Sequence, residues 1–178
     1  MQYLLKITLK DTPVWRLVAI DGTADIAFVA ELIAASFDYE KARRLFVVNG
    51  VEYSAGNGGN VENVKELSLF DELHLEQGQN CIYRHNLNNE LIHNVEVMKK
   101  EDHLFCLMPS TLVGAGLLPK DMSFDLEHIN AYFDKDDIAS LDLRECTKRM
   151  RALGVKRKDL NESLLRLGAC DFSVKINV

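Results

Sequence analysis

Hydrophobic and polar residues alternate at the start of the chain. The stretch from Tyr3 to Lys10 has the two-residue period of a half-buried strand, and a second apolar strand runs from Val14 to Ile20. Between them, Asp11, Thr12 and Pro13 supply turn chemistry. The pattern therefore predicts that the chain opens with an antiparallel hairpin.

The period then changes to that of a helix. Asp25 is placed to cap a helix that ends near Phe37, because its apolar residues recur at three- and four-residue spacing. Two apolar stretches follow, on either side of Asn49 and Gly50, which together favour a tight hairpin turn. A short helix is expected between Ser68 and Leu75. These elements indicate a sheet with a helix packed on it.

The stretch from Tyr83 to Val97 is predicted to be another hairpin, in which two alternating runs meet at Asn88 and Asn89. Only a loop with an odd number of residues gives this hairpin one consistently apolar face, because burial fixes the register of a strand pair. A three-residue loop pairs His85 with His93. We therefore expect the two histidines to be neighbours on a partly buried face.

The pattern is less regular after this hairpin. Leu104 to Met108 is a strand candidate, and Pro109 to Met122 has the glycine-interrupted pattern of an irregular connection. Ser123 is placed to cap a helix that runs through Phe133. Its inward positions are expected to be Leu126, Ile129 and Phe133.

From residue 136 onward the pattern is helical. Two apolar stripes are separated by Leu153, Gly154 and Val155, so a helical hairpin is predicted, followed by a short strand from Phe172 to Ile176. The expected fold class is α+β, a mainly antiparallel sheet with helices packed on it. We divide the chain into an α+β domain, residues 1–133, and a C-terminal helical extension, residues 134–178.

Composition fits a folded cytoplasmic protein. The chain has 178 residues, of which 47% are hydrophobic and only 3 are proline, so it can bury a substantial core. Apolar runs stay shorter than a membrane helix or a signal peptide needs, so no membrane association is expected. The four cysteines lie far apart among apolar neighbours and are interpreted as reduced core residues.

Charge is distributed unevenly along the chain. The formal net charge is -6, but residues 140–178 hold 9 basic and 5 acidic side chains. The basic residues that flank the Gly154 turn are Arg144, Lys148, Arg149, Arg151, Lys156, Arg157 and Lys158. Their layout faintly resembles a helix-turn-helix, which predicts nucleic-acid binding. The interpretation we favour is a helical hairpin that packs on the acidic body.

Candidate chemistry is sparse. Two neighbouring histidines, His85 and His93, are compatible with a metal site or a proton shuttle. However, the sequence places no carboxylate or cysteine beside them at ligand spacing, so we favour core histidines with hydrogen-bonded tips. We expect no metal, no cofactor and no catalytic residue.

Four segments, in order, resemble the Ri-plasmid open-reading-frame-three family (pRiA4b ORF-3-like) of insertion-element passenger proteins. Pro13-Val14-Trp15-Arg16 is similar to the opening Pro-x-Trp-Arg signature of that family. Ile33 to Asp38 resembles the segment that leads into a Gly-Trp-Asp turn, although that Gly and Trp are absent here. Cys106, with Ala115 to Asp121, is similar to the family's Cys-to-Pro-Pro-Glu-Asp segment. The resemblance covers residues 3 to 133.

The hairpin is the remaining match. Family members tend to read Tyr-x-Tyr-Asp-Phe-Gly-Asp-x-Trp-x-His, which aligns with Tyr83, His85, Asn86, Leu87, Asn88, Asn89, Leu91 and His93. Both aspartates are asparagine here, so the family-site remnant is Tyr83, His85, Asn86, Asn89 and His93. If the aspartates bind a cation or act as acid and base, that function is impaired in this chain. If they only shape the turn, asparagine serves as well.

The resemblance implies an α+β fold and a link to mobile elements, without a reaction. The sequence as a whole predicts a non-catalytic interaction or structural module that binds an unknown protein partner or another copy of itself. The alternative is a nucleic-acid-associated accessory protein that uses the basic C-terminal residues.

Overall fold

The computed structural model describes residues 1–56, 64–87, 90–104, 106–118, 126–135 and 140–166, with side chains up to residue 154. Its elements, in chain order, are β1 (Gln2–Leu9), β2 (Trp15–Asp21), α1 (Ile26–Phe37), β3 (Arg44–Val48), β4 (Val51–Ser54), the 3-10 helix η1 (Phe70–Leu73), β5 (Asn80–His85), β6 (Leu91–Glu101), β7 (Ser110–Ala115), α2 (Leu126–Phe133) and α3 (Leu143–Arg166). The α+β fold class predicted from the sequence is confirmed.

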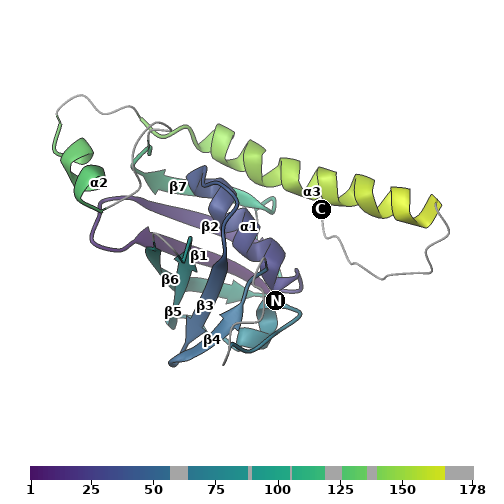
Figure 1. Ribbon diagram of the computed structural model, residues 1–178. Helices are drawn as coiled ribbons and strands as arrows, with labels where there is room; N and C mark the ends of the chain where they lie inside the picture. The colour runs from purple at the N-terminus through teal and green to yellow at the C-terminus, as the bar shows by residue number, and fades with distance from the viewer. Residues whose placement is uncertain (57–63, 88–89, 105, 119–125, 136–139, 167–178) are drawn as a thin grey trace.

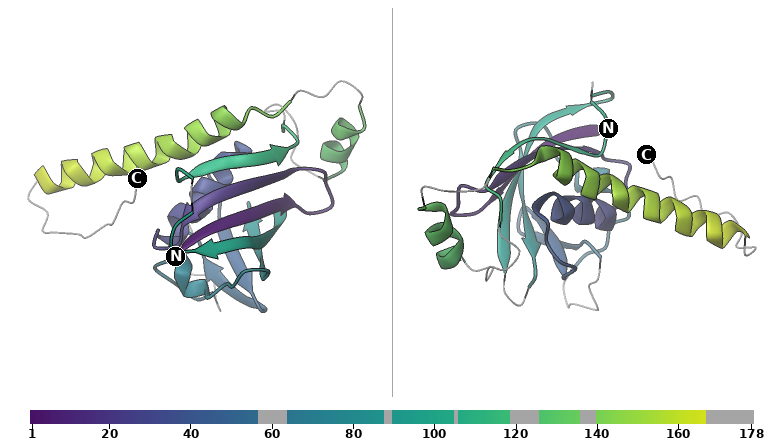
Figure 2. Two further views of the ribbon diagram at one scale, coloured as in Figure 1. Left: turned by 180° about the vertical axis from the view of Figure 1, so that it is seen from behind. Right: turned by 90° about the horizontal axis from the view of Figure 1, so that it is seen from above.

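The seven strands form one antiparallel sheet in the order β4-β3-β5-β6-β1-β2-β7 (Figure 1). One face is covered by α1 and by the first half of α3, as the views in Figure 2 show. Alternate residues of β1, β5 and β6 are buried against these helices, which is the period expected when one face of a sheet is covered. The core therefore lies between the sheet and α1.

Local sequence explains the elements that were predicted well. The Asp25 carboxylate accepts hydrogen bonds from the backbone N–H groups of Ala27 and Phe28 and so caps α1. Asn49 and Gly50 both have positive φ angles at the β3–β4 turn, which is the geometry that an Asn-Gly pair favours. The opening hairpin pairs β1 with β2 as expected.

The region after β6 corrects two predictions. Within the predicted strand from Leu104 to Met108, the described residues, 104 and 106–108, are outside any strand. By contrast, Ser110–Ala115, within the segment expected to be irregular, forms β7 and pairs with β2. In β7, polar residues are buried and apolar residues are exposed, which is the reverse of the usual pattern: Ser110 and Thr111 are buried, while Leu112 and Val113 are exposed. In α2, Ile129 is buried as predicted, but Leu126 is 41% exposed.

The predicted C-terminal helical hairpin is wrong, because α3 is a single helix from Leu143 to Arg166 that passes through Gly154 without a turn. Gly154 lacks the positive φ that ends many helices, and a lone glycine costs a helix only about 1 kcal/mol relative to alanine. Cys146 and Met150 anchor the first half of α3, since both are fully buried. The expected final strand and Ser123 lie outside the described residues.

Candidate functional site

The two histidines of the β5–β6 hairpin lie on the buried face of the sheet, as the odd-loop argument predicted. The register differs, however: Tyr83 pairs with His93, and His85 pairs with Leu91, so five residues separate the last pair. The reason is local. Asn86 adopts a positive φ of 55°, so β5 ends two residues before the point that a three-residue loop requires. The N–H of Asn86 donates to the carbonyl of Arg43.

Three further aromatic residues surround the histidines. We use the term aromatic–histidine cluster for Phe37, Tyr39, Tyr83, His85 and His93. The Tyr39 hydroxyl lies 2.9 Å from Nε2 of His93, and the Tyr83 hydroxyl lies 3.1 Å from Nδ1 of His85. Tyr39 also contacts both imidazoles, with ring centroids 4.8 Å from His85 and 5.5 Å from His93. Each histidine tip is thus held by a tyrosine.

Burial keeps the two histidines neutral. It lowers the pKa of His85 to about 4, with a further contribution from the positive charge of Arg44, while the Glu40 backbone opposes the shift. Burial also lowers the pKa of His93 to about 3, and the adjacent His85 adds to the effect. The hydroxyls of Tyr39 and Tyr83 remain protonated, because burial raises the pKa of both.

The hydrogen bonds around Tyr83 favour one tautomer of His85. Tyr83 can donate its hydroxyl proton to the carbonyl of Ala30, 3.2 Å away, since a carbonyl only accepts. In that arrangement Nδ1 of His85 donates to the Tyr83 hydroxyl, and Nε2 carries the lone pair.

We expect nitrogen-15 NMR of the histidine rings at pH 7 to show His85 neutral and protonated at Nδ1. The Tyr83→Phe variant removes the hydroxyl that accepts from Nδ1, so the Nε2-protonated form should gain population. Unchanged ring nitrogen shifts in Tyr83→Phe would contradict the assignment. His103, which is exposed, serves as the internal reference in the same spectra.

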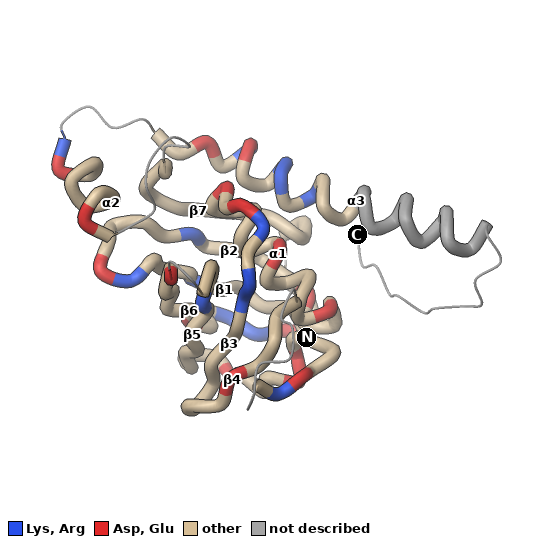
Figure 3. The backbone as a smooth tube through the Cα atoms, in the orientation of Figure 1, with Lys and Arg blue, Asp and Glu red and all other residues tan. Residues whose placement is uncertain are grey.

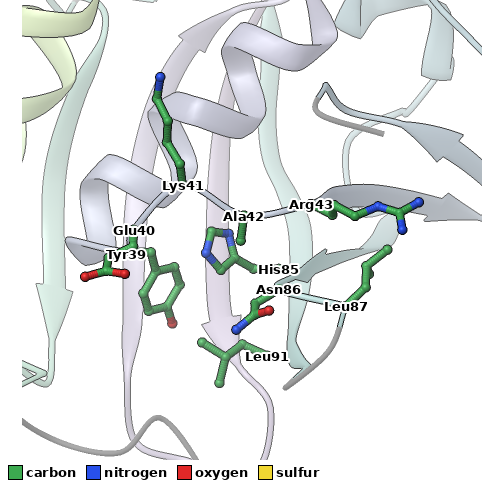
Figure 4. Close-up of a pocket in the computed structure, with 9 residues that line it drawn as sticks. All are labelled: Tyr39, Glu40, Lys41, Ala42, Arg43, His85, Asn86, Leu87 and Leu91. Carbon is green, nitrogen blue, oxygen red and sulfur yellow. The ribbon is translucent and has the colours of Figure 1, made fainter. Parts of the chain in front are cut away.

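A cavity of about 290 Å³ opens beside His85 (Figure 4). It is bounded by the loop of residues 39–43, by residues 85–87 and by Leu91. Figure 4 shows Tyr39, His85, Asn86 and Leu91 close together, with the Lys41 and Arg43 side chains directed outward from the loop. The lining therefore combines imidazole, phenol and amide groups with the charged residues of the loop and with an aliphatic wall from Leu87 and Leu91, and polar groups predominate.

A buried arginine, Arg16, packs against the aromatic–histidine cluster through Phe37. The guanidinium of Arg16 lies 4.7 Å from the ring centroid of Phe37 and is only 1% exposed. It donates hydrogen bonds to four backbone carbonyls, those of Trp15, Ser36, Ala115 and Gly116. These carbonyls come from β2, from the end of α1 and from the end of β7, so Arg16 joins three elements.

The structure brings together some, but not all, of the site residues predicted from the sequence. Tyr83, His85 and His93 meet in the cluster, Asn86 lines the cavity, and Asn89 lies outside the described residues. The sequence interpretation missed Tyr39, which follows α1 directly and had no pattern to mark it. It also did not single out Arg16 as a site residue, although the alternation of β2 places that residue on the buried face with Val14 and Val18.

The described residues offer neither a metal-binding cluster nor a membrane-spanning helix. Within the described ranges, no three His, Cys, Asp or Glu side chains come together in a way that could hold a metal ion. Over the same part of the chain, no helix combines the length and apolar character needed to cross a bilayer. Cys81, Cys106 and Cys146 are free thiols.

The fold and site define an α+β protein with a seven-stranded antiparallel sheet and a neutral histidine pair beneath a small cavity. The chain is similar in structure to a protein of unknown function from Methanosarcina mazei Go1, MM3350, with a TM-score of 0.57 and 16% identity over 75% of this chain and 79% of that one. This likeness shows the fold alone. No family model matches the chain, and no curated protein matches it in sequence.

Proposed function

We propose that the protein is a non-catalytic binding module and that the cavity beside His85 is its binding site. The observation that carries this proposal is that His85 lines the cavity while its ring, like that of His93, is joined to a tyrosine hydroxyl. A general acid or base works best with a pKa near the working pH, and the pKa values of about 4 and about 3 are far below neutrality. Such a pair holds a ligand better than it moves protons.

The same proposal includes kinship with the Ri-plasmid open-reading-frame-three family. The segments that carry the resemblance lie far apart in sequence, yet they meet in space. Arg16 of the first segment contacts Phe37 of the second and donates to the carbonyls of Ala115 and Gly116 in the last. Phe37 in turn contacts His93 of the hairpin segment, with ring centroids 5.1 Å apart. A shared structural unit explains why these motifs would persist together.

The expected ligand is small and carries an N–H or O–H donor. Nε2 of His85 can accept from it, and the Asn86 side-chain amide can both donate and accept. The pocket is near the lower end of the size range of ligand sites, about 300 Å³, so a fragment rather than a large cofactor fits.

A fragment screen by backbone NMR shifts tests the proposal. Polar fragments with a ring N–H or an amide should perturb Asn86, Leu87 and Leu91 in the wild-type protein. The Ala42→Leu variant narrows the cavity, so binding should weaken at least about tenfold, equivalent to about 1.4 kcal/mol. A matched control is Ala131→Leu, because Ala131 is exposed on α2 and does not line the cavity.

Two results would overturn the proposal. One is a screen in which no fragment perturbs the cavity residues, and the other is binding that survives unchanged in a folded Ala42→Leu protein. Recovery of a chemically converted fragment would contradict the non-catalytic part. Melting curves of both variants establish that each is folded.

A further inference from the structure

The basic residues of α3 separate into two groups with different surroundings. Arg149 is directed toward the body, where its Nε donates to the carbonyl of Ala35 at 2.9 Å and its guanidinium lies 3.4 Å from the Asp38 carboxylate. Arg144, Lys148 and Arg151 instead line a groove between α3 and β7. They are spaced four and three residues apart, so they form one stripe along the helix.

The groove has a volume of about 450 Å³, and its other walls include Thr111 of β7 and Thr147 of α3. These threonines are tied together, since Thr111 N–H donates to Oγ1 of Thr147 at 3.0 Å. The hydrogen bond fixes α3 against the edge strand of the sheet. The three cations are therefore presented by a rigid scaffold.

The acidic side chains beside the groove do not cancel the positive charge of its three basic residues. Glu145 lies 3.1 Å from Nζ of Lys148, but both side chains are more than half exposed, so the pair is weak. The Asp142 carboxylate accepts from the backbone N–H groups of Arg144 and Glu145 and so serves as the cap of α3. Figure 3 shows the acidic and basic residues along the first half of the helix.

The spacing of the cations suits a polyanion. Seven residues of helix advance about 10 Å at 1.5 Å per residue, and each strand of a duplex rises about 3.4 Å along the duplex axis for every phosphate, so the stripe spans about three phosphates when α3 lies along that axis. The six residues that line the groove include no aromatic ring to stack on a base. We propose that this groove binds the phosphate backbone of double-stranded nucleic acid without reading its sequence.

The acidic body does not prevent this contact. At physiological ionic strength, exposed charges are screened beyond about 8 Å, so the field near the groove is dominated by its own residues. Figures 1 and 2 show α3 extending past the sheet and α1. Arg157, Lys156 and Lys158 also lie on this helix, but their side chains are outside the described part.

Fluorescence anisotropy with a short labelled DNA duplex tests the proposal over a series of salt concentrations. The triple variant Arg144→Gln, Lys148→Gln, Arg151→Gln should bind more weakly, and the slope of log K against log salt should fall by about 2 to 3, since each phosphate contact contributes about 0.9. A matched control with the same charge change is Lys10→Gln, Lys99→Gln, Lys135→Gln, at exposed positions away from the groove. Its slope should equal that of the wild type.

Three outcomes would overturn the proposal: no anisotropy change at micromolar protein in low salt, equal loss of binding in both triple variants, or an unchanged slope in the groove variant. A fourth arm uses poly-glutamate as competitor. If it displaces the duplex at equal charge concentration, the groove recognises an acidic protein rather than nucleic acid. None of the substituted residues lines the cavity at His85, so its fragment binding should be the same in all three proteins.

Discussion

Replacing Arg16 with methionine should lower the free energy of unfolding by about 3 kcal/mol or more. Methionine keeps the aliphatic volume but leaves the carbonyls of Trp15, Ser36, Ala115 and Gly116 without their donor. Each buried polar group that loses its partner costs about 1 to 3 kcal/mol, and relaxation of β7 recovers part of the sum. The stacking of the guanidinium on Phe37 is lost as well.

Urea unfolding measures this change directly. The control is Arg43→Met, because the Arg43 side chain is exposed and its replacement should alter stability by no more than about 0.5 kcal/mol. A loss below about 1 kcal/mol in Arg16→Met would show that the four hydrogen bonds do not join β2, α1 and β7 in solution.

Acid should destabilise the protein through the histidine pair. The ordinary pKa of histidine is about 6.5, and the folded-state pKa values are about 4 for His85 and about 3 for His93. Below pH 6.5 the histidines bind protons in the unfolded chain but not in the folded chain. The pair therefore does not reduce the free energy of unfolding above pH 6.5, and it lowers that free energy progressively as the pH falls toward 4. The shift of His85 alone corresponds to a loss on the order of 3 kcal/mol.

The double variant His85→Gln, His93→Gln removes this proton uptake. Its stability should be lower than that of the wild type at pH 7, but the difference between the two proteins should shrink as the pH falls from 6.5 to 4. His103→Gln is the control, because His103 is exposed. A difference that stays constant over this range would mean that the histidines are not held neutral in the folded protein.

The parts of the fold that sequence patterns predicted well are those with strong local signals. The strands β1 and β2 alternate cleanly, Asp25 caps α1, and Asn49-Gly50 sets the β3–β4 turn. Strand β7 was missed because it buries Ser110 and Thr111, whose stabilising contacts come from β2 and α3, far away in the sequence. The helical hairpin was predicted from Gly154, whose cost the flanking helix formers outweigh.

The site was predictable to a smaller extent. Alternation places His85 and His93 on one face, but their exact register depends on the Asn86 hydrogen bond to the carbonyl of Arg43, which comes from another element. Tyr39 reaches the histidines only because α1 lies across the sheet. Contacts of this kind depend on tertiary structure, so a single sequence gives no local pattern for them.

The segments that resemble the plasmid family converge on the same region. Arg16, Phe37 and His93 form a continuous line of contacts from the edge of the sheet to the histidine pair. If the proposed kinship holds, the cavity has an amide at Asn86 where members of that family have a carboxylate. We expect the cavity to favour neutral hydrogen-bonding ligands over cations.

The central claim is that the cavity at His85 binds a ligand and does not transform it. The most direct measurement follows the histidine ring nitrogens at pH 7 while a fragment that binds the cavity is titrated to saturation. We predict that the His85 Nε2 resonance shifts as it accepts a hydrogen bond, that the His93 resonances stay nearly unchanged, and that the fragment is recovered intact. A His85 signal that does not respond, or a fragment that is consumed, would contradict the account.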